Sequence, residues 1–172
     1  MPDHKQHIIS RMQSEGEKVV EYLGALRPAD WEHPVYTTGG RWRVREVLCH
    51  FVSAEKIFAF YGRQILNGGE GAPVGFKIDE FNETQVGGMA EREPSDLIRE
   101  FVERRADTVS LVEGMQDGDF ERIGRHPWFG LVPLGDMLKL IYRHNTIHLR
   151  DVRKAIETGQ PVPHTVDPPN VA

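Results

Sequence analysis

The chain has 172 residues, of which 39% are hydrophobic and 27% are charged, and its formal net charge at pH 7 is −5. These values are typical of one globular domain, which we expect over residues 1–160, followed by a C-terminal tail over residues 161–172. The acidic balance argues against a nucleic-acid partner, because phosphate backbones are bound by basic surfaces. The single cysteine argues against a disulfide framework. The polar N-terminus argues against a secretion signal, and the lack of an apolar run of about 18 residues argues against a membrane span. We therefore expect a cytoplasmic protein.

Two amphipathic helices are predicted in the first half of the chain. Apolar residues recur at steps of three and four from Ile8 to Leu26, which places them on one helical face that must end before Pro28. A loop is expected next, because the segment "RPADWEHPVYTTGGRW" contains two prolines and a Gly-Gly pair. The helical period returns from Val44 to Ile65 and ends at "NGGEGAPVG".

The third quarter of the chain is less regular. Residues 79–92 are predicted to form a short extra helix, although Gly87 and Gly88 lower its intrinsic stability. Pro94 suits the first turn of a third long helix, whose apolar stripe extends to Met115. The stretch "DGDFERIGRHPWFGLVPLG" is expected to be a long loop, of the kind that often carries function between packed helices.

A fourth long helix is predicted from Leu134 to Ile156, with its end near Gly159. Four long amphipathic helices, with neither an alternating strand pattern nor an internal repeat, indicate an all-α protein. We therefore expect a four-helix bundle with long connections and one short extra helix. The connections are long enough to allow either an up-down-up-down order or a crossover order of the helices.

The fourth predicted helix carries two histidines on its apolar face. Ile141 is followed at helical steps by His144, His148 and Val152, so both imidazoles are expected to point inward. Histidines four residues apart on a helix can coordinate one divalent ion. A buried histidine is more often satisfied by a carbonyl or a carboxylate, so the pair alone leaves both interpretations open.

A third inward histidine changes this balance. His50 follows Val47 by three residues and shares the inward half of its helix with Ala54. Buried imidazoles need partners for their ring nitrogens, so three of them in one small bundle favour a common ligand. Three protein ligands with an open fourth position are typical of catalytic zinc sites, and imidazole also binds nickel, iron and copper. The predicted metal ligands are therefore His50, His144 and His148.

Two acidic residues and a cysteine lie near these positions in the sequence. Asp151, three residues after His148, is expected either to accept a ring N–H or to form an exposed ion pair with a neighbouring arginine. Glu55 either orients a group near the site or is solvated. Cys49 is expected to be a small core residue, since consecutive helical residues point about 100° apart and it cannot share an ion with His50.

His126 lies in "RHPWFGLVP", beside Trp128 and Phe129 and just before the fourth helix. It is either a surface histidine next to a turn-forming proline or a residue that lines the mouth of a pocket with these two aromatic side chains. The remaining histidines are expected at the surface: His4, His7, His33 and His164.

Four segments of the chain resemble the DinB-like superfamily: "WRVREVLCHFVSAEKIF", "DEFNETQ", "HPWFGLVPLGDML" and "YRHNTIHLRDVRKAIE". The resemblance covers residues 5–158 and includes the YfiT-type proteins and the metal-binding domain of mycothiol-dependent maleylpyruvate isomerase. Its most specific part is one histidine in the second helix and an HxxxH pair in the last. The resemblance implies a four-helix bundle, often a homodimer, with zinc or nickel held by His50, His144 and His148.

The sequence differs from the isomerase in two respects. The isomerase pattern has a glutamate at the first position of the last-helix pair, where this chain has His144. The chain also ends soon after the fourth helix, so we do not expect the C-terminal domain of that isomerase. The first difference argues against isomerase activity and favours a branch of the family with three histidines.

Three functional hypotheses follow. In the leading one, a low-molecular-weight thiol such as mycothiol, bacillithiol or glutathione binds the metal as a thiolate and attacks an electrophilic substrate. The loop with Trp128 and Phe129 would position that substrate, and His126 or Glu55 would move a proton. In the second hypothesis the same ion activates water for hydrolysis. In the third the protein is a non-catalytic metal-binding or stress-response protein.

Overall fold

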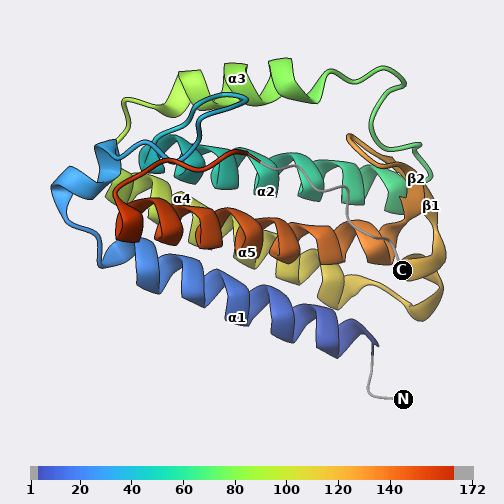
Figure 1. The fold of residues 1–172 in the computed structure, drawn as a ribbon. Helices are drawn as coiled ribbons and strands as arrows, with labels where there is room; N and C mark the ends of the chain where they lie inside the picture. Colours follow the sequence, from blue (N-terminus) through green and yellow to red (C-terminus); the bar gives the residue numbers. More distant parts are fainter. Residues whose placement is uncertain (1–3, 165–172) are drawn as a thin grey trace.

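The structure is a computed structural model that describes residues 4–164, and four long helices form its bundle (Figure 1). These helices are α1 (His4–Gly24), α2 (Val44–Leu66), α4 (Pro94–Gly114) and α5 (Leu134–Thr158). A shorter helix, α3 (Ile78–Met89), packs against the outer side of α2. The predicted all-α four-helix bundle with a short extra helix is therefore confirmed. Within the described residues, no helix combines the length and apolar character needed to cross a membrane.

The helix ends lie close to their predicted positions for local chemical reasons. At the start of α2, the backbone N–H of Arg43 donates to the carboxylate of Glu46 at 2.7 Å. Pro94 occupies the first turn of α4, where its missing N–H removes no helical hydrogen bond. Gly159 ends α5 in the left-handed conformation, with φ of +69°.

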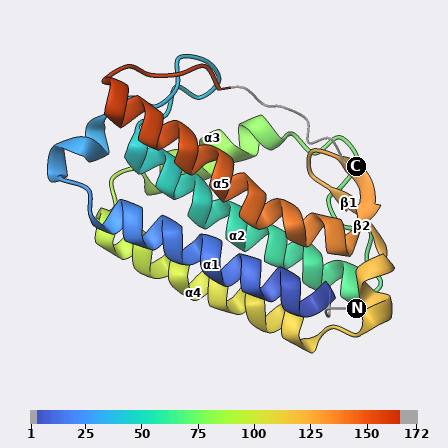
Figure 2. The same cartoon turned by 60° about the horizontal axis from the view of Figure 1, so that its bottom comes forward.

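The helices follow a crossover order rather than a simple up-down-up-down order. Both α1 and α2 pack against α4 and α5, so α1 and α2 lie diagonally across the bundle (Figure 2). The connection through α3 carries the chain back along the bundle, so α4 runs in the same direction as α2 (Figure 1). The neighbouring helices α2 and α5 run antiparallel, and this arrangement brings their inward faces together.

The connection over residues 117–135 is more regular than the predicted loop. It contains a short 3-10 helix, η2 (Asp117–Glu121), and two strands, β1 (Ile123–His126) and β2 (Gly130–Pro133). The strands pair antiparallel, with His126 opposite Gly130. The expectation of no strands was wrong here, because a four-residue strand places only two side chains on each face and shows no clear alternation. A second 3-10 helix, η1 (Pro28–Glu32), lies in the predicted loop before α2.

A layer of buried polar side chains divides the hydrophobic core. One apolar cluster surrounds the start of α2 and the end of α5, and the other lies toward the hairpin. Between them, the middle turns of three helices contribute buried polar residues: His50, Ser53 and Glu55 on α2, Arg105 and Thr108 on α4, and Asn145 and His148 on α5. Buried polar groups must be satisfied by partners, so this layer is where a functional site is expected.

The hairpin is held against the end of α2 by a tight backbone contact at Gly71. Gly71 has φ of +86°, and a Cβ atom there would lie 2.6 Å from the carbonyl oxygen of Arg125. Gly75 has φ of +76°, but a Cβ there would meet no described atom within 4 Å. Both alanine variants are strained by the positive φ, whereas only Gly71→Ala also disturbs the hairpin contact.

We therefore expect Gly71→Ala to lower the free energy of unfolding by about 2 kcal/mol more than Gly75→Ala does. Urea unfolding of the two variants and the wild-type protein measures this difference. Equal losses in the two variants would contradict the steric argument, because the two positions share the backbone conformation and differ in what surrounds them.

Candidate metal centre

Three imidazoles meet between α2 and α5. The Nε2 atom of His50 lies 2.7 Å from Nε2 of His144, which lies 3.0 Å from Nε2 of His148. The ligand atoms of these three residues lie within 4.8 Å of one another. Among residues 4–164, this is the group of histidine, cysteine and acidic side chains whose geometry could hold a metal ion. The structure thus brings together the three residues that the sequence pattern had singled out.

The donor set fits a divalent ion. Imidazole nitrogens about 2.0–2.1 Å from a tetrahedral zinc lie roughly 3.3 Å apart. The two Nε2 separations to His144, 2.7 and 3.0 Å, are only slightly shorter than this. Burial lowers the pKa of all three histidines, to about 3 for His144 and well below the ordinary range for His50 and His148. The rings are therefore neutral at pH 7, and their converging nitrogens offer lone pairs to a cation.

His148 is oriented by a hydrogen-bond chain that starts in the loop before α2. The hydroxyl oxygen of Tyr36 lies 2.5 Å from Nδ1 of His148 and 3.0 Å from Oδ2 of Asp151. When Nε2 of His148 faces the centre, its Nδ1–H donates to Tyr36, whose hydroxyl proton then goes to Asp151. Burial raises the pKa of Tyr36, so the hydroxyl stays protonated.

Asp151 thus reaches the site through an intermediate that the sequence pattern did not indicate. Tyr36 lies 112 residues from His148 in the chain, and nothing in its local sequence marks it as a partner. The other carboxylate oxygen of Asp151 accepts hydrogen bonds from Arg150, at 3.1 and 3.2 Å. Asp151 therefore accepts the hydroxyl of Tyr36 rather than the predicted ring N–H, and its ion pair with Arg150 involves a carboxylate that is buried rather than exposed.

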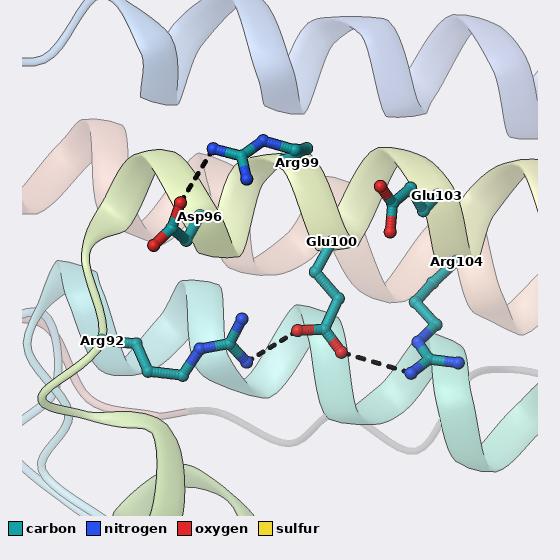
Figure 3. Close-up of a pocket in the computed structure, with 6 residues that line it drawn as sticks. All are labelled: Arg92, Asp96, Arg99, Glu100, Glu103 and Arg104. Atoms are coloured by element: carbon teal, nitrogen blue, oxygen red, sulfur yellow. Dashed lines mark hydrogen bonds and ion pairs between the residues drawn. The ribbon is translucent and has the colours of Figure 1, made fainter.

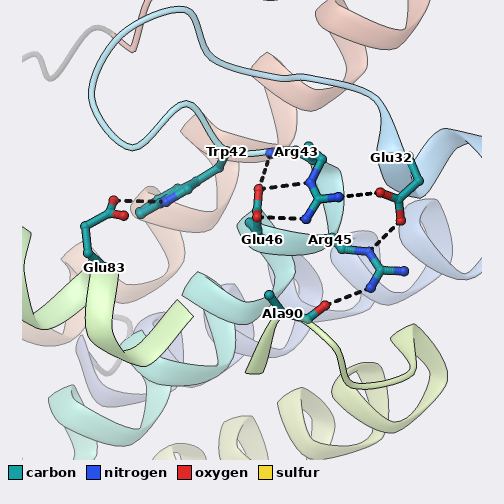
Figure 4. Close-up of polar contacts among 7 residues, drawn as sticks. All are labelled: Glu32, Trp42, Arg43, Arg45, Glu46, Glu83 and Ala90. Atoms are coloured by element: carbon teal, nitrogen blue, oxygen red, sulfur yellow. Dashed lines mark hydrogen bonds and ion pairs between the residues drawn. The ribbon is translucent and has the colours of Figure 1, made fainter. Parts of the chain in front are cut away.

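Trp42 covers His50 on α2. The rings of Trp42 and His50 lie 4.6 Å apart between centroids, at an angle of 40°. The indole N–H of Trp42 donates to the carboxylate of Glu83 on α3 at 3.2 Å, so α3 helps to hold this ring in place (Figure 4). An apolar ring against His50 limits both the movement of the imidazole and its contact with water.

The loop that supplies Tyr36 and Trp42 is anchored by an ion-pair network (Figure 4). Arg43 pairs with Glu46 at 2.9 Å and with Glu32 at 2.5 Å. Arg45 pairs with the other oxygen of Glu32 at 2.8 Å. It also donates to the backbone carbonyl of Ala90, the residue that follows α3. These contacts join η1, α2 and the end of α3, and so they fix the loop above the histidines.

Glu55 lies inside the polar layer and is only 1% exposed, so it is not solvated. Arg105 donates to both oxygens of this carboxylate, at 2.5 and 3.1 Å, and Thr108 donates at 3.3 Å. The same guanidinium bonds to the side chain of Asn145 and, at 2.5 Å, to the carbonyl of Met12. The network therefore connects all four long helices beside the two histidines on α5, and Glu55 holds this part of the bundle together.

His126 is buried in the hairpin, with 4% of its surface exposed, so it is not a surface histidine. Its Nδ1 accepts backbone N–H groups from Trp128 at 3.0 Å and Phe129 at 3.2 Å, and its ring stacks on Phe58 at 5.0 Å. An accepting Nδ1 requires the proton on Nε2, which has no partner among the described residues. Burial lowers the pKa of His126 to about 4, so the ring is a neutral N–H donor.

His164, which is predicted at the surface, is partly exposed and packs against the rings around this centre. Its ring stacks on Tyr36, with centroids 4.3 Å apart, and lies 5.3 Å from the ring of His148. No helical periodicity marks this residue, because it follows the last helix. The rest of the predicted tail, residues 165–172, lies outside the described residues.

Two surface hollows lie away from these histidines. One, of about 340 Å³, is lined by charged residues at the start of α4, where Arg99 pairs with Asp96 and both Arg92 and Arg104 pair with Glu100 (Figure 3). The other, of about 430 Å³ and mainly apolar, lies between α2, α3 and α4. The first consists largely of ion pairs, and neither hollow is lined by a metal-centre histidine, so the histidine cluster remains the candidate site.

Comparisons with known proteins agree with this description. The sequence model of the DinB superfamily matches residues 11–152. A search of curated proteins finds no match.

Solved structures resemble this chain at low sequence identity. YfiT from Bacillus subtilis, described as a probable metal-dependent hydrolase with an unusual four-helix bundle topology, has a TM-score of 0.76 and 17% identity over 93% of this chain and 90% of its own. Mycothiol-dependent maleylpyruvate isomerase has a TM-score of 0.73 and 13% identity over 88% of this chain and 61% of its own. The colibactin self-resistance protein ClbS, in complex with double-stranded DNA, has a TM-score of 0.67 and 16% identity over 87% of this chain and 95% of its own. At these identities the likeness establishes the fold.

Proposed function

Since this chain belongs to the DinB superfamily, we propose that it binds a divalent metal ion through His50, His144 and His148 and acts as a metal-dependent thiol transferase. The observation that carries the proposal is the convergence of three Nε2 atoms, at 2.7 and 3.0 Å, from rings whose pKa values are lowered by burial. We propose zinc or nickel as the ion, because imidazole nitrogen is a preferred ligand of both.

A bound divalent ion supplies Lewis acidity that lowers the pKa of a coordinated thiol, so that a thiolate nucleophile exists at neutral pH. The three ligand rings are neutral, so they do not compensate the positive charge of a bound divalent ion. This favours an anionic fourth ligand. Tyr36 and Asp151 keep His148 in the tautomer whose Nε2 faces the centre. These residues thus prepare a site suited to a thiolate from a low-molecular-weight thiol.

We assign substrate positioning to the hairpin. His126 is held in one tautomer by the backbone N–H groups of Trp128 and Phe129, and its Nε2–H has no partner among the described residues. This N–H would donate to an oxygen of the electrophilic substrate as negative charge develops there, and the lowered pKa keeps the donor neutral. Trp128 and Phe129 would contribute an apolar wall, while Glu55 orients the neighbouring helices through Arg105.

Several further features belong to the same proposal. The partners are a small thiol and an electrophilic substrate, in the cytoplasm, and the protein is a homodimer, as the family resemblance implies. We propose no nucleic-acid partner because the net charge is −5. The domain spans residues 1–160, and residues 161–172 form a C-terminal segment.

A metal-dependent hydrolase is the second candidate. The same neutral ligand set is suited to a bound hydroxide as well as to a thiolate. The likeness to YfiT, which is described as a probable metal-dependent hydrolase, favours this alternative.

The experiment that separates these functions starts from metal content, measured by elemental analysis after loading with zinc or nickel. The loaded protein is then assayed with mycothiol, bacillithiol or glutathione and a chloronitrobenzene electrophile, and separately with a nitrophenyl ester without thiol. Metal-dependent thiol consumption is the expected result, whereas ester hydrolysis alone would favour the hydrolase. A chelator that lowers the melting temperature, with neither activity present, would indicate a non-catalytic metal-binding protein.

A further inference from the structure

The chain returns to the metal centre after its last helix. Residues 160–164, here called the C-terminal arm, run alongside the loop that precedes α2. The N–H of Val162 donates to the carbonyl of Val35 at 2.8 Å, and its carbonyl accepts the N–H of Thr37 at 3.0 Å. Val162 thus forms a parallel β-bridge with Tyr36, and its two hydrogen bonds lie on either side of Tyr36. They fix the backbone of the arm two residues before His164.

The arm places the ring of His164 among the aromatic residues that cover the metal centre. The rings of His164 and Tyr36 are stacked, with centroids 4.3 Å apart and an angle of 28°. The ring of Trp42 lies 6.0 Å from that of His164 at 45°, and the ring of His148 lies 5.3 Å away. His164 therefore contacts the same group of rings that supports the metal ligands.

Two of those rings each hold one predicted ligand. Tyr36 is hydrogen-bonded to Nδ1 of His148, and Trp42 lies against His50. A movement of either ring would free the ligand behind it. His164 lies beside both rings, so it is the residue through which the arm can act on two ligands at once.

The loop opposite the arm is shaped to receive this ring. Gly39 has φ of +66°, and a Cβ atom there would lie 3.1 Å from Nδ1 of His164. Most other residues would be strained at this φ and would crowd the imidazole. The backbone N–H of His164 also donates to the hydroxyl of Thr38 at 2.9 Å. Side-chain packing and backbone contacts therefore hold His164 independently.

We propose that the C-terminal arm clamps the metal centre, with the face of the His164 ring holding Tyr36 and Trp42 against His148 and His50. The clamp raises metal affinity because the ligand rings are already oriented before the metal binds. This inference rests on the proposed function in one respect, namely that the three histidines bind a metal. His164 is a positioning residue in this scheme and acts through its ring face rather than through a ring nitrogen.

Cobalt(II) titration of the metal-free protein, followed by its visible absorption, tests the clamp. Residues that support metal ligands typically change affinity 10–100-fold when they are replaced, and we expect a loss of that size in His164→Ala. His164→Phe keeps an aromatic ring without a nitrogen, so its affinity and absorption spectrum should remain close to those of the wild-type protein. His7→Ala, at an exposed histidine on α1, is the control and should change neither.

The outcomes distinguish the clamp from the proposed function. If His164→Ala binds cobalt with unchanged affinity, the clamp is overturned while the metal site stands. If His164→Ala and His164→Phe lose affinity equally, the effect belongs to the ring nitrogen, and the clamp is again overturned. A wild-type protein that binds no cobalt overturns the proposed function itself. The melting temperatures of metal-free His164→Ala and His164→Phe show whether both variants are folded. When the two melting temperatures are equal, the difference in cobalt affinity between the variants decides whether the aromatic ring acts as the clamp.

Discussion

Replacing His148 with alanine is expected to remove the stabilisation that a bound metal provides. At a free metal concentration 100 times the wild-type dissociation constant, binding stabilises the wild-type protein by about 2.7 kcal/mol. The variant loses one of the three proposed Nε2 ligands and the ring that bonds to Tyr36. We expect its affinity to fall by more than about 100-fold, which leaves less than about 0.5 kcal/mol of stabilisation at the same metal concentration.

Thermal unfolding with and without metal measures this difference, and elemental analysis gives the stoichiometry. His7→Ala is the matched control, since this imidazole is exposed on α1 and away from the cluster. The control should bind metal like the wild-type protein. Unchanged metal stoichiometry in His148→Ala would refute the coordination proposed here.

The second large effect is expected for Arg105→Met. This guanidinium is the positive partner of Glu55, and the two side chains are 6% and 1% exposed. The substitution leaves a buried carboxylate without its cation and also removes the bonds to Asn145 and Met12. Breaking a buried pair in this way costs about 3–5 kcal/mol, so Arg105→Met should lose that much free energy of unfolding.

Chemical denaturation compares this variant with Arg99→Met, an arginine to methionine change on the same helix. Arg99 pairs with Asp96 at 2.8 Å, but both side chains are largely exposed (Figure 3). Exposed pairs contribute about 0–1 kcal/mol, so the control should lose less than about 1 kcal/mol. Similar losses in the two variants would show that the buried network does not connect the helices as described.

Some features of the fold and the site follow a local pattern, and these were predictable. The apolar stripes of α1, α2, α4 and α5 have the helical period, and the ends of these helices coincide with prolines, glycines and capping residues. His144 and His148 lie one turn apart on such a stripe, so their shared direction follows from helix geometry alone. His50 was recognised in the same way, from its place on the inward face of its own helix.

Other features depend on residues that are distant in sequence. The pairing of β1 with β2 involves strands too short to show alternation, and it is this hairpin that buries His126. Glu55 has no visible partner in its own helix, because Arg105 lies 50 residues away on α4. Short-range periodicity carries no information about such contacts.

The sequence by itself determined the four helices, the inward direction of three histidines and the chemical type of site that they favour, because each of these depends on spacing within one helix. Only the tertiary structure decided that the three Nε2 atoms meet at one point, that Tyr36 and Trp42 cover two of the rings, and that the C-terminal arm brings His164 beside them. These contacts join segments that are far apart in the chain, since Tyr36 and His148 are 112 residues apart and Thr38 and His164 are 126 residues apart. They exist because the crossover of the chain makes α2 and α5 antiparallel neighbours, and no local pattern encodes that packing.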